Sequence, residues 1–293
     1  MLILPGKNGK GLANTLLTTG DRLVEIRSSF FPNGEQRVRV VGPSAGEKVL
    51  VVVGMAIDPD QAIIQTLLLI DALKEGGAGS ITLLIPFLGY SFQNKRLEGE
   101  AISVRQIGKV LSSSGADKII VVDLHDRAEL QYFDVEVENI SLGPRLAEEA
   151  REELNGVEDA CVVSPDQGSL TRASEFARIL GLPLISMSKK RDSESLVVGE
   201  HQVKEGEVKK HCLVVDDAVN SGGTVVGVTR SLRAIGASRV SWYVTHFMGV
   251  PGSYDRIEKE IDLLVTTNTL DHGLVDNDRV RVIELGKKDL GLA

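Results

Sequence analysis

A run of small and acidic residues, VVDDAVNSGGT (residues 214–224), has the composition of a phosphate-binding loop. Gly222 and Gly223 let the backbone curl, so that successive N–H groups of the loop and of the following helix converge on one phosphate. The hydroxyl groups of Ser221 and Thr224 can donate further hydrogen bonds. The alternative is a tight turn with a helix cap, which a bare glycine pair also fits.

Two carboxylates, Asp216 and Asp217, precede this loop at the expected carboxyl end of an apolar strand. Open α/β sheets bind ligands at that edge. The two side chains can there accept hydrogen bonds from sugar hydroxyls, or hold a metal ion through water. The acid pair therefore favours a ligand site over a simple turn.

Short β-branched runs alternate with helical segments, which predicts buried parallel strands in an α/β sheet. The expected strands are Lys48 to Val53, Ser80 to Ile85, Lys118 to Val122, Ala160 to Val163, Leu182 to Ser186, Cys212 to Val215, Val240 to Val244 and Leu263 to Thr266. The expected helices are Asp60 to Glu75, Gly143 to Asn155 and Thr224 to Ala234, with Gly76, Gly77 and Gly236 as stops.

An internal repeat indicates that the chain holds two copies of one fold. Residues 48–89 match residues 210–249 strand for strand, although any two strand–helix–strand units look somewhat alike. We therefore predict two domains, at residues 1–142 and 143–293. The acid pair and the glycine pair occur in the second copy, so the second domain is expected to bind phosphate.

The composition is that of a compact globular protein, with 42% hydrophobic and 25% charged residues in a chain of 293. A formal net charge of −8 argues against a nucleic-acid partner bound through bulk charge. No apolar stretch approaches the roughly 20 residues that a membrane helix needs, so no membrane partner is expected. Cys161 and Cys212 lie in apolar runs and are expected to be buried free thiols of a cytoplasmic protein.

Further motifs follow in order along the chain: FPNGE (31–35), PFLGYSFQNKR (86–96), DLHD (123–126), SPDQGSLTRA (164–173) and KKR (189–191). Together with the loop, this series resembles the ribose-phosphate diphosphokinase family over nearly the whole chain. The resemblance implies an α/β fold of two tandem phosphoribosyltransferase-like domains, each a mainly parallel sheet flanked by helices. It also implies transfer of the β,γ-diphosphate of ATP to the C1 hydroxyl of ribose 5-phosphate.

The resemblance carries the family's ligand contacts onto this chain. ATP is expected at Phe31, Asn33, Glu35, Phe92, Gln93, Asn94 and His125. Ribose 5-phosphate is expected at Asp216, Asp217, Asn220, Ser221, Gly222, Gly223 and Thr224.

The implied reaction lays a triphosphate in line with a sugar hydroxyl, so a Mg²⁺ cofactor is expected to neutralise negative charge. His125 and Asp166, each at the end of a buried strand, are the candidate metal contacts, and Asp123 could orient them. Taken alone, a histidine at a strand end is structural more often than not. The Asp-Leu-His context reverses that interpretation.

Lys189 and Arg191 open a polar stretch, residues 192–202, that suits a lid over the site. The resemblance makes them the catalytic residues, stabilising charge on the transferred group. A bare charge pair would otherwise indicate a solvated loop.

The chain departs from the family pattern at three of these positions. Phe92 stands in place of an Arg, Asn94 in place of an Asp, and Asn220 where many members carry an Asp. The first two changes remove one cation and one carboxylate from the expected nucleotide site. An amide at residue 220 can still hydrogen-bond a sugar hydroxyl, so that change is the milder one.

Two other functions stay open. A phosphoribosyltransferase uses a similar acid-pair loop, although the duplicated architecture argues against one. A catalytically silent, regulatory homologue is favoured by Phe92 and Asn94 and opposed by the retained Lys189, Arg191, His125 and Asp166. Because family members assemble as dimers and often hexamers, the resemblance also implies a homo-oligomer.

Overall fold

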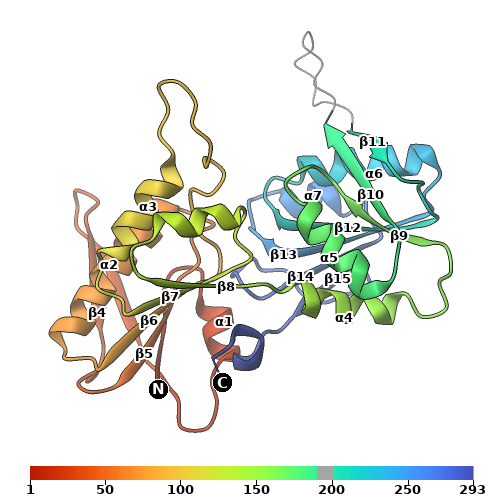
Figure 1. Ribbon diagram of the computed structural model, residues 1–293. Coiled ribbons are helices and arrows are strands. Elements are labelled where there is room, and N and C mark those ends of the chain that lie inside the picture. Colours follow the sequence, from red (N-terminus) through yellow and green to blue (C-terminus); the bar gives the residue numbers. More distant parts are fainter. Residues whose placement is uncertain (190–200, 293) are drawn as a thin grey trace. The chain divides into compact units, whose positions relative to one another are not determined.

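The computed structural model describes residues 1–189 and 201–292. The chain divides into two compact units, each built around a sheet of its own (Figure 1). The first unit holds Met1–Ser141 with two later segments, Asn268–Asp271 and Glu284–Ala293. The second unit holds Leu142–Thr267 with His272–Ile283.

The first unit contains a parallel sheet with the strand order β2-β1-β5-β6-β7-β8 and a separate antiparallel hairpin, β3-β4. Its strands are β1 (Leu2–Pro5), β2 (Arg22–Leu23), β3 (Ile26–Phe30), β4 (Gln36–Val40), β5 (Lys48–Val52), β6 (Ser80–Ile85), β7 (Lys118–Val122) and β8 (Glu136–Ile140). Its helices are α1 (Lys10–Thr15), α2 (Pro59–Glu75), α3 (Ser103–Ser112) and the 3₁₀ helices η1 (Arg127–Tyr132) and η2 (Lys287–Leu290).

The second unit contains a sheet with the strand order β11-β10-β9-β12-β13-β14-β15, in which β10 and β11 are antiparallel and the other pairs parallel. Its strands are β9 (Ala160–Ser164), β10 (Leu184–Lys189), β11 (His201–Glu205), β12 (His211–Val219), β13 (Arg239–Phe247), β14 (Leu263–Thr267) and β15 (Val280–Ile283). Its helices are α4 (Gly143–Glu153), α5 (Leu170–Leu180), α6 (Gly223–Ile235) and α7 (Ser253–Ile257).

The helix ends follow from local chemistry. Pro59 occupies the first turn of α2, where its missing N–H costs no helical hydrogen bond. Gly77 adopts φ +72° just after that helix, and Gly236 adopts φ +114° just after α6. Because a residue without Cβ adopts this left-handed conformation at little cost, both helices stop where the glycines predict.

The predicted fold class is confirmed: each unit contains a mainly parallel sheet flanked by helices. The expected strands and helices are all present; β6 and β7 have the expected ends, and the ends of the others are shifted. The largest shift is in β12, which continues past Val215 to Val219. Its partner β13 pairs with the extension, Asp216 opposite Val244 and Val219 opposite Phe247, so the acid pair lies within the strand.

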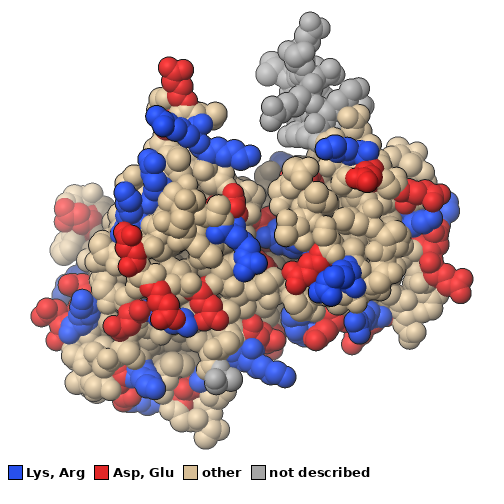
Figure 2. Space-filling model, in the orientation of Figure 1, with Lys and Arg blue, Asp and Glu red and all other residues tan. Residues whose placement is uncertain are grey.

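The expected buried thiols are neighbours in the second sheet. Cys161 of β9 lies opposite Cys212 of β12, and their sulfur atoms are 3.6 Å apart. Both side chains are buried and form no disulfide, as expected. In the described part of the chain, no helix is long and apolar enough to cross a membrane. On the face drawn in Figure 2, Lys and Arg are interspersed with Asp and Glu.

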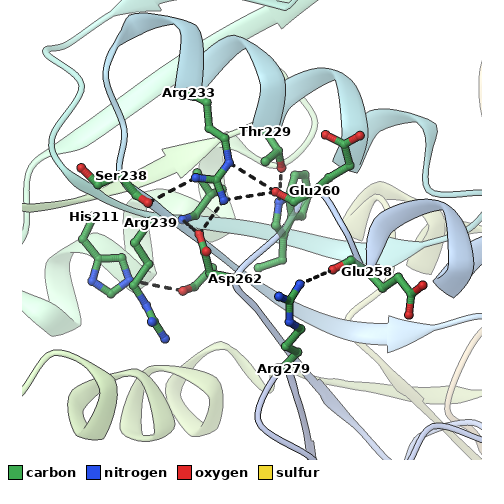
Figure 3. A network of polar contacts seen from close by, with 12 residues as sticks. His211, Thr229, Arg233, Ser238, Arg239, Glu258, Glu260, Asp262 and Arg279 are labelled. Carbon is green, nitrogen blue, oxygen red and sulfur yellow. Dashed lines mark hydrogen bonds and ion pairs between the residues drawn. The ribbon is translucent and has the colours of Figure 1, made fainter.

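A network of polar contacts lies at the amino ends of the strands of the second sheet (Figure 3). Arg233 of α6 donates to the carboxylate of Asp262 at 2.8 Å and to the backbone carbonyl of Ser238 at 3.2 Å. Asp262 also accepts the backbone N–H of Val240, at the start of β13. These contacts join α6 to the strand ends opposite the predicted phosphate loop.

Glu153, at the end of α4, is the buried acceptor of a second polar cluster at this edge. It accepts hydrogen bonds from Arg239 at 2.8 Å, from Ser241 and from Tyr243, and His211 lies 3.1 Å away. Burial raises the pKa of Glu153, but hydrogen bonds from these four neighbours outweigh it and lower the pKa to about 2.

Glu153 is expected to make the stability of the second unit depend on pH. Because its pKa falls from 4.5 to about 2 on folding, its contribution is complete above pH 4.5 and is lost as the pH falls toward 2. The difference corresponds to about 3 kcal/mol. Glu153→Gln should lower the free energy of unfolding by about that amount at neutral pH and flatten the pH profile. Urea unfolding at several pH values tests this, and parallel profiles for parent and variant would contradict it.

Candidate functional site

The predicted phosphate loop joins β12 to α6 in the second unit, and its two glycines differ in role. Gly222 precedes α6 with φ +80°, and a Cβ there would lie 2.6 Å from Cγ2 of Ile257. Gly223 is the first residue of α6, and the nearest atom to a Cβ there is Oγ of Ser221, at 3.8 Å. Gly222 is therefore required by the fold, whereas Gly223 leaves space at the helix terminus.

The first turn of α6 presents backbone donors. The N–H of Val226 makes the first helical hydrogen bond, to the carbonyl of Gly222 at 3.1 Å. The N–H groups of the preceding residues have no acceptor within an α-helix, and the helix dipole adds positive potential at this end. With Ser221 and Thr224 exposed beside them, these donors can bind a phosphate.

Helix α7 contacts the loop at Ser221 and Gly222. The guanidinium of Arg256 donates to the backbone carbonyl of Ser221 at 2.9 Å. Gly222 packs against Ile257 and the backbone of Ser253. These supports lie about thirty residues after the loop and follow no motif spacing, so the sequence analysis did not identify them.

The acid pair belongs to a larger polar cluster at the carboxyl edge of the second sheet. The hydroxyl of Ser169 donates to Asp216, and the backbone N–H of Ser169 donates to Asp166 at 3.1 Å. The backbone N–H of Asp217 also donates to the Asp216 carboxylate, at 2.9 Å. The structure thus brings together Asp166 and Asp216, which the sequence places fifty residues apart.

The surroundings of Asp216 disfavour its ionised form. Burial raises the pKa of Asp216 well above its usual value, and the charges of Asp217 and Asp166 add to that effect. The hydrogen bond from Ser169 opposes it. A hydroxyl donor or a cation bound at this edge would favour the ionised form of Asp216, so the cluster suits a sugar or a metal ion.

In the first unit, His125 follows β7 through a sharp turn. Asp123 is buried and adopts φ +41°, and the next N–H, that of Leu124, donates to the side chain of Asn139 at 3.1 Å. His125 is half-buried, and the ring of Phe92 meets it edge-on with centroids 5.6 Å apart. Phe92 is 53% exposed, so its ring is available to a ligand beside His125.

The segment around Phe92 is anchored at two of its side chains. Gln93 contacts the hydroxyl of Ser103 and donates to Glu100 at 3.0 Å. Asn94 donates to the carboxylate of Glu129 at 3.4 Å. The predicted nucleotide residues Phe92, Asn94 and His125 therefore gather at the carboxyl end of β7.

The remaining nucleotide residues lie on the β3-β4 hairpin. The N–H of Phe31 donates to the carbonyl of Glu35 at 2.8 Å, and the side chain of Asn33 accepts the N–H of Glu35 at 3.3 Å. The hydrogen bonds recorded for these three residues stay within the turn, and Phe31 is 49% exposed. The structure thus places them on an exposed turn of their own.

The loop that corresponds to the phosphate loop in the first unit is filled by protein groups. The side chain of Asn8 donates to the carbonyls of Gly54 and Ile57 at 3.2 and 3.0 Å. Lys7 pairs with Asp58 at 3.0 Å, and Pro59 removes one N–H from the start of α2. In the first unit, Asn8 and Lys7 thus contact the segment between β5 and α2.

The described part of the chain does not show the predicted metal contacts as one group, and it does not include the predicted catalytic side chains. Among the described residues, no three His, Cys, Asp or Glu side chains group closely enough to hold a metal ion. His125 and Asp166 belong to different units. Lys189 ends β10, its side chain lies outside the described part of the structure, and so does the whole of Arg191.

The sheet topology and the glycine loop define an α/β protein of the phosphoribosyltransferase type in its second unit. A model of the N-terminal domain of ribose phosphate pyrophosphokinase matches residues 1–115, and a phosphoribosyl transferase domain model matches residues 135–269. The chain belongs to the ribose-phosphate pyrophosphokinase family.

Full-length relatives support this membership. The chain is 33% identical over 270 residues to ribose-phosphate pyrophosphokinase from Thermococcus kodakarensis, covering 92% of this chain and 94% of the relative. It is 31% identical over 294 residues to the Pyrococcus abyssi protein, covering 99% of each. Phosphoribosylpyrophosphate synthetase from Mycobacterium smegmatis superposes with a TM-score of 0.85 at 30% identity, over 100% of this chain and 96% of that one. The family predicted from the motifs is confirmed.

Proposed function

We propose that this protein transfers the β,γ-diphosphate of ATP to the C1 hydroxyl of ribose 5-phosphate. The products are 5-phosphoribosyl 1-diphosphate and AMP. One observation carries the proposal: within a chain of this family, the open helix terminus at Gly223 adjoins a strand that bears the Asp216 and Asp217 pair. That arrangement can hold both the phosphate and the hydroxyls of a sugar phosphate.

Separate groups of residues are proposed to bind the sugar phosphate, bind the nucleotide and stabilise the transferred group. The N–H groups at the start of α6, with Ser221 and Thr224, bind the 5-phosphate. Asp216 and Asp217 accept hydrogen bonds from sugar hydroxyls and fix the orientation of C1. Phe92 and His125 contact the nucleotide. The C1 hydroxyl then loses its proton to solvent and its oxygen forms a bond to the β-phosphorus, while the bond from that phosphorus to the α,β-bridging oxygen of ATP breaks and AMP leaves with that oxygen. Lys189 and Arg191 stabilise the charge on the transferred group.

Mg²⁺ is the proposed cofactor, and the chemistry of the donor set is compatible with it. Mg²⁺ usually takes one or two carboxylates and fills its other positions with water and substrate phosphates. Asp123 and His125 are the metal contacts predicted in the first unit, and Asp166 is the one predicted in the second. When bound, Mg²⁺ would neutralise negative charge on the triphosphate. A homo-oligomer, as a dimer or a hexamer, is part of the same proposal.

Release of AMP tests the proposed function. With Mg²⁺ and ATP, AMP should appear at a rate that depends on added ribose 5-phosphate, with 5-phosphoribosyl 1-diphosphate formed in equal amount. AMP release independent of the sugar would indicate a hydrolase. Binding of both substrates without turnover would favour the regulatory homologue, the second candidate, which the exposed ring of Phe92 in place of a cation supports.

A further inference from the structure

Glu129 is a buried acid for which the proposed reaction has no stated use. It lies on η1, and its residue is 1% exposed. Its Oε1 accepts the hydrogen bond from Asn94, and its buried Oε2 has no hydrogen-bond partner among the described residues. Burial raises the pKa of Glu129 to about 7, because the neighbouring Ser91 and Asn94 offset only part of its cost. Buried carboxyl groups with an unsatisfied oxygen are rare in folded proteins.

The surroundings of Glu129 place it within the candidate nucleotide site. Ser91 and Asn94, which lower its pKa, lie on either side of Phe92 in the sequence. The charge of His125 also acts on Glu129, and His125 is the residue that Phe92 meets edge-on. Glu129 therefore holds the segment that carries Phe92 through Asn94 and lies near enough to His125 for the two charges to interact.

We propose that Glu129 is a positioning residue for the nucleotide: its carboxyl group holds Asn94 and so fixes the segment that presents Phe92 beside His125. The inference rests on the proposed function, because it assigns Glu129 to the ATP half of the reaction. It also accounts for Asn94, which stands where the family pattern has an Asp. An acid at residue 94 would meet the acid at residue 129, so the amide and the carboxyl group form a matched pair.

Removing the carboxyl group should weaken ATP binding and spare the chemical step. For Glu129→Ala we expect the KM for ATP to rise about tenfold, as for the loss of one hydrogen bond to a charged group. The kcat and the KM for ribose 5-phosphate should stay within about twofold of the parent. Glu129→Gln keeps an acceptor for Asn94 and should restore the parental KM. Glu136→Gln, which removes an exposed carboxylate at the start of β8, serves as the control.

A reciprocal exchange separates positioning from general stability. Asn94→Asp alone should weaken ATP binding, because two carboxyl groups then face each other. Adding Glu129→Gln to it restores one acid and one amide, and ATP affinity should recover to within about threefold of the parent. Both variants keep the size of the side chains, so they test the inference even where Glu129→Ala does not fold. Thermal unfolding of every variant checks for loss of structure.

Two results would overturn the inference. In a parent that releases AMP, an unchanged KM for Glu129→Ala would show that Glu129 does not position the nucleotide. A double variant that binds ATP no better than Asn94→Asp alone would have the same meaning. If calorimetry shows that the parent binds ATP but no AMP is released, the proposed function is wrong. The role of Glu129 is then tested separately, by comparing the dissociation constants of the same variants for ATP. A parent that does not bind ATP would refute both.

Discussion

Gly223→Val is expected to abolish most binding of ribose 5-phosphate while leaving the fold of the second unit intact. The space around Gly223 is open in the structure, so the isopropyl group displaces the ligand and not the protein. Losing two hydrogen bonds between backbone N–H groups and a charged phosphate, at about 1.5 kcal/mol each, weakens affinity about a hundredfold. Calorimetry with ribose 5-phosphate measures the loss, and parental affinity would place the sugar phosphate elsewhere.

Gly222→Val is the matched comparison, because it should fail for a different reason. Gly222 combines φ +80° with a Cβ position 2.6 Å from Ile257, so any side chain there strains the backbone and pushes α7 away. Strain of this kind costs about 1 to 3 kcal/mol before the clash is counted. The variant should unfold at lower temperature, whereas Gly223→Val should not. Equal melting temperatures for the two would contradict the different roles of the glycines.

The central strand–helix–strand units could be predicted because their strands are buried on both faces. Such strands are continuous apolar runs, and the helices between them end at glycines, as α2 ends before Gly77. The edge strands carry no such signal. The strand β4, for example, has the sequence QRVRV with only two apolar residues, and it pairs with β3 in a two-stranded hairpin outside the main sheet, so it was not predicted.

Site residues were found where a motif carries chemistry and missed where packing alone assigns the role. Asp216 stands out beside a glycine pair, and Ser169 lies in the motif of residues 164–173, but nothing in the sequence distinguishes Arg256 from other polar residues. Glu129 has no motif either, and its burial depends on how η1 packs against α3. The sequence also could not separate Gly222 from Gly223, because the difference lies in the backbone angle and in the contact with α7.

Lys189→Ala and Arg191→Ala are each expected to lower turnover by about a hundred- to a thousandfold, with dissociation constants for ATP and ribose 5-phosphate within a few-fold of the parent. A cation that meets the β-phosphate mainly in the transition state contributes more to the rate than to substrate binding. The loss of one such contact typically costs about 2.7 to 4 kcal/mol. Lys204→Ala, which removes an exposed cation from β11, should leave the rate unchanged.

The same measurements distinguish a catalyst from a silent regulatory homologue. Variants that lose substrate affinity while kcat stays near the parental value would make Lys189 and Arg191 binding residues, because the loss of uniform binding raises KM and leaves kcat unchanged. A parent that binds both substrates but releases no AMP with Mg²⁺, at any phosphate concentration, has no turnover for these substitutions to reduce. In that case Phe92, which stands in place of a cation, would be the first residue to replace. Phe92→Arg restores the charge of the family pattern. Recovery of AMP release would show that Phe92 causes the loss of activity.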